Sequence, residues 1–258
     1  MKKVLSSERI GKENKNKNGS IMKIVDYIDP EHITIQFEDG YQKIISYSNF
    51  VAGSVKNPYD KTCYGVGYLG EGDYVSRVNK LIFPQYSIWH SMIERCYNKK
   101  SQEKYPTYID CIVCDEWHNY QNFAKWYDDN YYEVEKGKME LDKDILVKGN
   151  KIYSPETCVF VPNKINSLFI KNDISRGESL IGMTYEKSSN KYKVNCSNKN
   201  NKTGTAIFIG RFATQKLAFN AYKEFKETYI KQIANEYRDK IPQKLYNAMC
   251  KYEVEITD

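Results

Sequence analysis

A run of apolar residues at four-residue spacing in the C-terminal third constrains the fold of this 258-residue chain more than any other feature. The spacing predicts a long amphipathic helix, because residues four apart lie on one helical face. Thr214 is the expected N-cap, since its hydroxyl can accept a first-turn backbone N–H, and Pro242 limits extension at the other end. The predicted stripe consists of Leu217, Ala221, Phe225, Tyr229, Ile233 and Tyr237, widened by Ala218 and Tyr222.

Three strand-like runs precede this helix, near Leu180–Tyr185, Lys191–Cys196 and Thr205–Phe212. A helix with one apolar face needs a partner layer, and three short strands supply one. The sequence therefore predicts a compact α+β module at this end of the chain. A polar stretch around Asn172–Glu178 is the expected linker to the residues before it.

The N-terminal part predicts a small antiparallel sheet. Apolar residues occupy every second position in one run, the pattern of a strand that is buried on one face. Glu38-Asp39-Gly40 follows that run, and Asp-Gly is a strong hairpin signal because both turn positions tolerate positive φ. The expected strands are Ile21–Ile28, Ile33–Phe37 and Tyr41–Tyr47. Together they look like an SH3-like barrel, with Val55–Tyr74 as an irregular connector after it.

Helices are expected in the middle of the chain. Ile88, Met92 and Cys96 are four apart, which predicts a helix over Ser87–Tyr97. A second helix is expected over Asn119–Asn130. The composition of the chain thus changes near Pro84 from strand-like to helical patterns.

The formal net charge of +6 is modest, and its distribution along the chain is more informative. From Glu186 to Lys240 there are 12 Lys/Arg against 5 Asp/Glu, whereas from Tyr105 to Ile145 there are 4 against 10. A basic flank beside an acidic patch suits a protein that docks on phosphates and holds a divalent cation nearby. Two solvated faces of opposite sign would give the same counts. The 23 tyrosines leave a similar choice, between polar binding faces and small, half-wet cores.

Several broad classes of protein are disfavoured. No stretch approaches the roughly 20 apolar residues of a membrane span, so no membrane partner is expected. Met1-Lys2-Lys3 is followed by no apolar segment, so a secretory signal is not expected either. Seven cysteines without regular spacing do not suggest a disulfide framework, which favours a reducing, intracellular compartment such as the cytoplasm.

The segment Leu141–Phe169 carries the most informative motif. In it, Leu141-Asp142-Lys143-Asp144-Ile145 is followed by Gly149-Asn150, by the strand-like Tyr153–Pro162 and by Asn163-Lys164-Ile165-Asn166. This order resembles HNH nucleases, the ββα-metal class, in which a strand ends in Asp-His, a loop and a second strand follow, and a helix brings a further Asn or His. The resemblance implies Asp142 and Asn166 as metal ligands. Lys143 stands where that family carries its catalytic His.

The same resemblance implies metal-dependent cleavage of duplex DNA. Phosphodiester cleavage needs a hard cation such as Mg²⁺ or Mn²⁺ held by oxygen ligands, and a base that activates water. An unperturbed lysine has a pKa of about 10.4, so Lys143 can contact the phosphate but cannot accept a proton at neutral pH. His118 is the preferred substitute base, and His90 is the other candidate. The alternative is a plain hairpin in which Asp142 and Asp144 are turn residues.

The pair Cys111-Ile112-Val113-Cys114 resembles half of a zinc knuckle. A structural zinc site needs four ligands, and Cys96, Cys158 or His118 could complete the set. No second Cys-x-x-Cys pair exists in the sequence. Buried thiols without a metal are the other interpretation of Cys111 and Cys114.

The C-terminal module carries a second resemblance, on Ile181–Tyr185, Asn190–Val194, Ile209–Phe212 and Ala218–Tyr222. These residues resemble the AP2-type DNA-binding domain that accompanies many HNH homing endonucleases. In that family a three-stranded sheet lies in the major groove and the helix supports it from behind. The Trp-Arg pair that is usual on the strands of that family is absent here. The resemblance implies a sheet face that contacts phosphates and guanine edges through Lys191, Lys193 and Arg211, with Tyr185 and Tyr192 beside them.

Together these features predict a multidomain α+β protein with three parts. They are an SH3-like β domain at 1–60, an HNH-like ββα-metal domain at 61–175 and an AP2-like DNA-binding domain at 176–258. This combination is typical of phage-encoded and mobile-element proteins.

The first functional hypothesis is a metal-dependent DNA endonuclease with Lys143 in place of the usual His. One alternative is a catalytically inactive DNA-binding protein or phage counter-defence factor that uses the nuclease fold as a scaffold. A further alternative is a protein-interaction module with tyrosine-rich surfaces. Duplex DNA is the expected partner, and a homodimer is one of the oligomeric states that the sequence leaves open.

Overall fold

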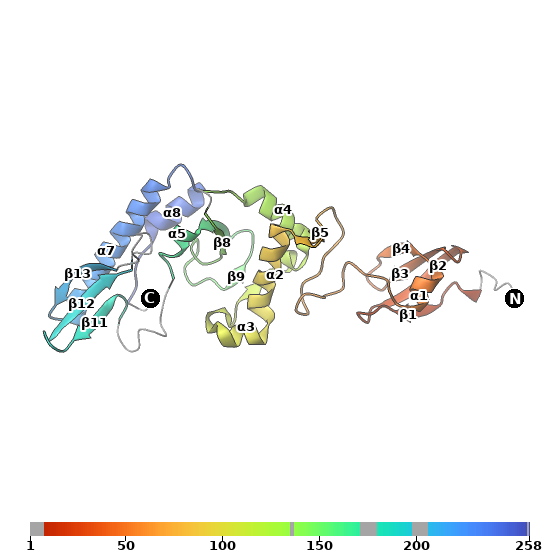
Figure 1. Cartoon of the computed structure of the whole chain (residues 1–258), viewed down its shortest axis with the longest axis horizontal. Helices are drawn as coiled ribbons and strands as arrows, with labels where there is room; N and C mark the ends of the chain where they lie inside the picture. Colours follow the sequence, from red (N-terminus) through yellow and green to blue (C-terminus); the bar gives the residue numbers. More distant parts are fainter. Residues whose placement is uncertain (1–7, 135–136, 171–179, 198–205, 257) are drawn as a thin grey trace. The chain divides into compact units, whose positions relative to one another are not determined.

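The computed structural model describes residues 8–134, 137–170, 180–197, 206–256 and 258 (Figure 1). The chain is a mixed α+β protein with several small sheets, and none of the sheets in this described part closes into a barrel. It forms two compact units, Met1–Asp129 and Asn130–Asp258. The expected linker around Asn172–Glu178 lies outside the described residues.

The first unit begins with a four-stranded antiparallel sheet in the order β1-β2-β3-β4. The predicted turn at Asp39-Gly40 forms, with Gly40 at a φ of 92°. The predicted strand Tyr41–Tyr47 stops short, because Ser46 caps a helix that begins at Tyr47. The expected SH3-like barrel is not closed, since β1 and β4 are the two edges of an open sheet. The elements are β1 (Glu13–Lys15), β2 (Ile21–Asp29), β3 (His32–Phe37), β4 (Gln42–Ile45) and α1 (Tyr47–Val51).

One face of this sheet packs on α1 and is mainly apolar. The buried residues are Met22, Ile24, Ile33, Ile35, Phe37, Phe50 and Val55. At one end, the buried carboxylate of Asp60 accepts hydrogen bonds from Asn16 (2.8 Å), Asn18 (2.7 Å) and Ser20. This network ties the connector after the sheet to the turn between β1 and β2.

The rest of the first unit is built from short helices around an aromatic core. Helix α2 begins at Pro84, earlier than the predicted Ser87, because proline is well placed in the first turn of a helix. Trp89 and Trp117 are fully buried, and Trp89 Nε1 donates to the Trp117 carbonyl at 2.7 Å. The elements are β5 (Arg77–Val78), β6 (Leu81–Ile82), α2 (Pro84–Tyr97), α3 (Lys99–Lys104), β7 (Ile112–Val113), α4 (Tyr120–Asn130) and the 3-10 helices η2 (Pro106–Tyr108) and η3 (Asp115–His118).

The second unit starts with the predicted strand–strand–helix order. Strand β8 (Met139–Asp142) pairs antiparallel with β10 (Val159–Pro162), and helix α5 (Asn163–Asn166) follows directly. The short strand β9 (Ile152–Tyr153) lies in the long connection between them. The Asn163 amide donates to the Lys138 carbonyl at 2.9 Å, which ties the start of the helix to the start of β8.

The last third forms the predicted sheet and helix. The sheet has the antiparallel order β11-β12-β13, with strands β11 (Met183–Glu186), β12 (Lys191–Cys196) and β13 (Ile207–Phe212). Thr205, the predicted start of the last strand, lies outside the described residues. Helix α7 (Gln215–Glu236) begins as predicted, with the Thr214 hydroxyl accepting from the Leu217 amide at 3.3 Å. Helix α8 (Gln243–Lys251) follows Pro242.

The buried face of α7 is displaced from the predicted stripe. Leu217, which opens that stripe, is 53% exposed. The buried residues keep the four-residue spacing but start one position later, at Ala218, because the face with Ala218 and Tyr222 packs on the sheet. The residues that α7 buries are Ala218, Tyr222, Lys226, Ile230, Ile233 and Ala234.

Helix α7 contributes to two separate hydrophobic cores. Its N-terminal half packs on the three-stranded sheet, where Ala218 and Tyr222 contact Met183, Val194 and Cys196. Its C-terminal half joins α8 against the strand–helix part. That second core contains Ile145, Val159, Val161, Ile165, Leu168, Ile230, Ile233, Leu245 and Met249.

The expected domain boundaries at 60/61 and 175/176 stay predictions, since the structure divides the chain only into two compact units. The change between the two units falls at Asp129/Asn130, within the expected HNH-like part. The reason is physical: the short β8–β10 hairpin and α5 cannot bury their apolar faces alone, and α7 and α8 cover them.

Among the described residues, no helix combines the length and apolar character that crossing a membrane requires. The seven cysteines, all within the described ranges, form no disulfide.

Candidate functional site

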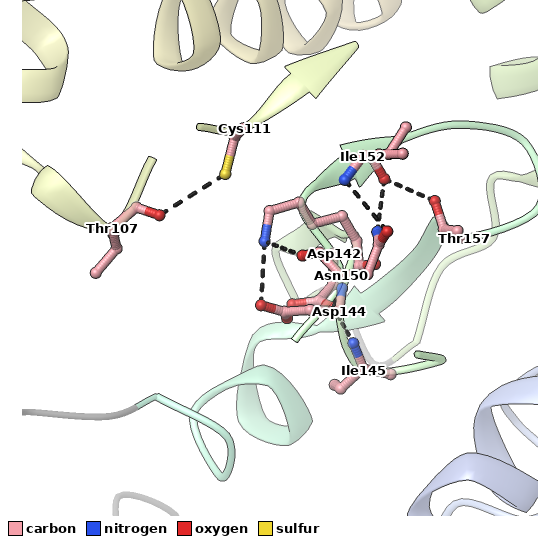
Figure 2. A network of polar contacts seen from close by, with 9 residues as sticks. Thr107, Cys111, Asp142, Asp144, Ile145, Asn150, Ile152 and Thr157 are labelled. Atoms are coloured by element: carbon pink, nitrogen blue, oxygen red, sulfur yellow. Dashed lines mark hydrogen bonds and ion pairs between the residues drawn. The ribbon is translucent and has the colours of Figure 1, made fainter. Parts of the chain in front are cut away.

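Asp142 closes strand β8 and directs its carboxylate into the loop that follows. Its Oδ1 accepts the backbone N–H groups of Asp144 (2.9 Å) and Ile145 (2.7 Å), as Figure 2 shows. This is an Asx-turn, in which an aspartate side chain imitates a backbone turn. Asp142 Oδ1 therefore acts as the acceptor of a turn, as in the alternative in which Asp142 is a turn residue. This applies to one of the two carboxylate oxygens.

The Asp142 carboxyl group is deeply buried beside a second carboxylate. The pKa of Asp142 is raised to about 6: burial is the largest cause and the negative charge of Asp144 adds to it, against the lowering effect of the two backbone hydrogen bonds. The folded loop thus favours the protonated form of Asp142 more than water does.

Lys143, at the position of the expected catalytic residue, points inward and is only 8% exposed. Its Nζ donates to Asp144 Oδ2 at 3.1 Å and to the Asn150 carbonyl at 3.0 Å, and it lies 5.9 Å from the centre of the Tyr153 ring. Asn150 reciprocates, because its side-chain Nδ2 donates to the Lys143 carbonyl at 2.7 Å and to the Ile152 carbonyl at 2.6 Å. Lys143 and Asn150 together cross-link the loop.

Asn166 ends helix α5 and is half-buried. Helix α5 packs next to β8 and β10, so the two expected ligands come from neighbouring elements of one hairpin–helix unit. No group of three or more His, Cys, Asp or Glu side chains within the described ranges is arranged to hold a metal ion.

The loop fits a divalent cation poorly. One oxygen of Asp142 is taken by two backbone N–H groups, and the charge of Asp144 is already balanced by the ammonium of Lys143. A cation would need to compete with that ammonium at short range, and like charges repel strongly at a buried site.

His118, the preferred substitute base, belongs to the first unit, whereas Asp142 belongs to the second. Its Nε2 lies 3.3 Å from the Tyr97 hydroxyl and its Nδ1 lies 3.6 Å from Asp115 Oδ1. Burial lowers the pKa of His118, and the charge of Asp115 opposes this effect. The ring has the contacts of a residue that holds η3 against α2.

The other residues that the sequence suggested in the first unit are also engaged locally. The His90 ring packs on the rings of Tyr64 (5.4 Å) and Tyr86 (5.9 Å). Cys111 is buried, and its Sγ donates to the Thr107 carbonyl at 3.7 Å (Figure 2). Cys114 is half-buried.

The C-terminal sheet has two chemically different faces, and its register assigns each residue to one of them. Lys193 pairs with Thr184 on one side and with Arg211 on the other, so these three side chains form a row on the same face. Lys191 lies two positions from Lys193 on that face, because alternate residues of a strand point the same way. We call this face, with Lys191, Lys193 and Arg211, the basic sheet face.

Tyr185 and Tyr192 lie on the opposite face. They pair with each other, with ring centres 5.1 Å apart, and Tyr192 also pairs with Phe212, which packs on the core beneath α7. The expectation that the two tyrosines lie beside the lysines on one face therefore differs from the observed register. Tyr192 packs against the core beneath α7, whereas Tyr185 is 44% exposed.

Arg211 does not stand alone on the basic sheet face. Its Nε donates to Glu186 Oε2 at 2.6 Å and its Nη2 to Glu186 Oε1 at 3.2 Å. The Arg211 guanidinium lowers the pKa of Glu186 to about 2, with help from the Ser189 hydroxyl. Glu186 is therefore ionised under all ordinary conditions and occupies the guanidinium that a ligand would otherwise contact.

Comparison of the chain with protein-family models, with curated proteins and with solved structures found no significant match. The HNH-like and AP2-like resemblances therefore stay predictions, and the function has to be argued from the geometry.

Three residues that organise these sites were not singled out as site residues. Asp144 and Asn150 hold Lys143, and Glu186 holds Arg211. A signal for the first two was present, because both lie within the HNH-like motif. Glu186 could have been found from the pairing of adjacent strands, since an acidic residue two positions after Thr184 shares its face.

Proposed function

We propose that this chain binds DNA through the basic sheet face of the second unit. The observation that carries the proposal is the cross-strand pair of Lys193 and Arg211, with Lys191 on the same face. The other face of the sheet packs on α7, so the strands are supported from behind while their basic side chains point outward.

The lysines on this face are available to a ligand. No ion pair within 4.0 Å joins Lys191 or Lys193 to another described residue. The charge of Lys193 acts on Glu186, which is the cross-strand partner of Lys191. Both lysines lie on a strand that is held by neighbours on each side. Ammonium and guanidinium groups on a rigid surface bind phosphates and release condensed counterions, which gives affinity without sequence preference.

Binding of a labelled duplex oligonucleotide at increasing NaCl concentrations tests this proposal. The logarithm of the association constant should fall linearly with the logarithm of salt concentration, because each neutralised phosphate contributes a slope of about −0.9. Replacing Lys191 and Lys193 together by Gln should reduce that slope by roughly 2.

The matched control is Lys231→Gln with Lys251→Gln, which removes the same charge from exposed positions on α7 and α8. This control should leave the slope unchanged. A chain that binds no duplex at low salt would overturn the proposal and favour a protein-interaction role.

Metal-dependent cleavage is a second candidate function, supported by the β8–β10–α5 order with Asp142 and Asn166 on neighbouring elements. The ion pair of Lys143 with Asp144 argues against it. Incubation of plasmid DNA with Mg²⁺ or Mn²⁺ tests it directly. Cleavage by the unmodified chain that disappears in Asp142→Ala, with DNA affinity retained, would establish this activity. Uncut plasmid across divalent metals would support the DNA-binding scaffold instead.

A further inference from the structure

A hollow of about 680 Å³ lies on the first unit, between the C-terminal half of α2, helix α3 and the 3-10 helix η2. Its volume is within the range of small-molecule sites in proteins. No residue of this hollow was singled out by the sequence motifs, and it is separate from the basic sheet face. The lining residues are Ser91, Glu94, Arg95, Asn98, Lys100, Ser101, Lys104, Tyr105 and Tyr108.

The charge of the hollow is positive. Three cations, Arg95, Lys100 and Lys104, line it against the single carboxylate of Glu94. Glu94 is itself engaged, because Asn98 Nδ2 donates to its Oε1 at 3.4 Å. Lys100 and Lys104 are exposed and lie four apart on one face of α3, so both ammonium groups can approach one anion.

The same hollow presents two aromatic rings. Tyr105 is 48% exposed, and the Lys104 ammonium lies 5.1 Å from the centre of its ring. The Arg95 guanidinium lies 5.5 Å from the centre of the Tyr108 ring. Pro106 stands between the two tyrosines at the start of η2 and restricts the backbone there. Each ring is therefore next to a cation on a stiff segment.

Two hydroxyl groups add hydrogen-bonding capacity. Within the described ranges, the side chains of Ser91 and Ser101 have no hydrogen-bond partner although both are half-buried in the lining. A ligand with phosphate oxygens or ring heteroatoms could use both. Cations, an accessible aromatic ring and unpaired hydroxyls together match the chemistry of a nucleotide, whose phosphate binds cations and whose base stacks on aromatic side chains.

We propose that this hollow binds a nucleotide, with the phosphate at Lys100 and Lys104 and the base on Tyr105. The nucleotide belongs either to an unpaired stretch of nucleic acid or to a free mononucleotide, since both carry the same phosphate and base. This proposal is independent of the basic sheet face, because its residues all lie in the first unit.

Two probes distinguish the sources. Binding of a fluorescein-labelled short oligothymidylate is measured on the full chain carrying Lys191→Gln and Lys193→Gln, which removes the lysines of the sheet face. Thymidine monophosphate is then added as a competitor and tested alone by calorimetry. Binding of the oligonucleotide without competition by the mononucleotide assigns the site to unpaired strands, whereas direct binding of the mononucleotide assigns it to a free nucleotide.

Variants in the hollow test the assignment of the residues. Tyr105→Ala should weaken binding roughly five-fold or more, because a base stacked on an aromatic ring loses its platform. Tyr105→Phe should retain it, since the ring is kept. Lys100→Gln with Lys104→Gln should weaken binding further and flatten its salt dependence, whereas Lys56→Gln with Lys61→Gln, an equal charge change at exposed positions of the same unit, should not.

These substitutions are at exposed positions, so thermal unfolding should be unchanged and a loss of binding cannot be ascribed to misfolding. The proposal is overturned if neither probe binds. It is also overturned if the lysine pair matters but Tyr105→Ala does not, because the hollow would then be a phosphate patch without a base site.

Discussion

The buried ammonium of Lys143 lies 3.1 Å from the carboxylate of Asp144, one residue along the chain. The neighbouring Asp142 carboxyl group receives two backbone N–H groups instead of a cation. Asp142 and Asp144, on either side of Lys143, thus have opposite electrostatic roles in one loop. The stability of the second unit should respond in opposite directions when each is neutralised.

Asp142→Asn should stabilise the chain at pH 8. The pKa of Asp142 is raised to about 6 in the folded state, so its ionised form costs free energy there. This cost is absent below the unfolded pKa of about 3.9, grows between that value and about 6, and is constant above it, on the order of 3 kcal/mol. Urea unfolding should show a larger free energy of unfolding for Asp142→Asn than for the unmodified chain at pH 8. This difference should disappear at pH 4.

Asp144→Asn should destabilise the chain at pH 8 by on the order of 1 kcal/mol. It leaves the buried ammonium of Lys143 with the Asn150 carbonyl but without its carboxylate partner. The effect is limited because the Asp144 side chain is partly exposed to solvent and because its neutralisation also relieves the repulsion on Asp142. Equal unfolding midpoints for the two single variants at pH 8 would contradict this account of the loop.

Glu186→Gln should tighten binding to duplex DNA about three- to ten-fold at low salt. The substitution removes a negative charge from the basic sheet face and releases the Arg211 guanidinium to contact a phosphate. Glu224→Gln, an equal charge change at an exposed position of α7, is the control. If both variants gain the same DNA affinity, the cause is the change in net charge and Arg211 makes no specific contact.

Lys226→Met should stabilise the second unit at neutral pH. Burial lowers the pKa of Lys226, so the charged form is disfavoured in the folded state. The cost is present below the folded pKa and vanishes as pH rises toward the unfolded pKa of about 10.4, so the gain should shrink in alkaline buffer. Lys231→Met, at an exposed position of the same helix, should change stability little. A larger gain at pH 10 than at pH 7 would contradict the assignment.

Local signals predicted the secondary structure well. The Asp39-Gly40 turn, the Thr214 cap and the β12 strand over Lys191–Cys196 all formed as expected. Each depends on the intrinsic preferences of a few consecutive residues, which a sequence displays directly.

Features that depend on partners distant in sequence were harder to predict. Lys226 is polar, so no apolar pattern could place it in the buried face of α7 between Tyr222 and Ile230. The register of the C-terminal sheet assigns Tyr185 and Tyr192 to the helix side, and a shift of one residue would reverse that assignment. The inward position of Lys143 depends on Asp144 and Asn150 closing around it, which the HNH-like motif did not indicate.

A chain that ends at Phe169 should lose the fold of its second unit, because α7 and α8 supply much of the core around Val159 and Ile165. Residues 1–129 should remain folded, since their cores lie within the first unit. Amide dispersion in the NMR spectra of two separate fragments, residues 1–129 and residues 130–169, checks both expectations. A well-dispersed spectrum for residues 130–169 would show that the strand–helix part is self-sufficient.

Helix α7 gives the second unit one further property, because it is a single rigid element shared by two cores. A ligand on the basic sheet face lowers the free energy of the folded state as a whole. The stability of β8, β10 and α5 therefore rises as well, although the ligand makes no contact with them. Amide protons of the distant hairpin should therefore exchange more slowly when the sheet is occupied. Amide exchange in the loop after β8 would then report on binding at the sheet that packs on the N-terminal half of α7.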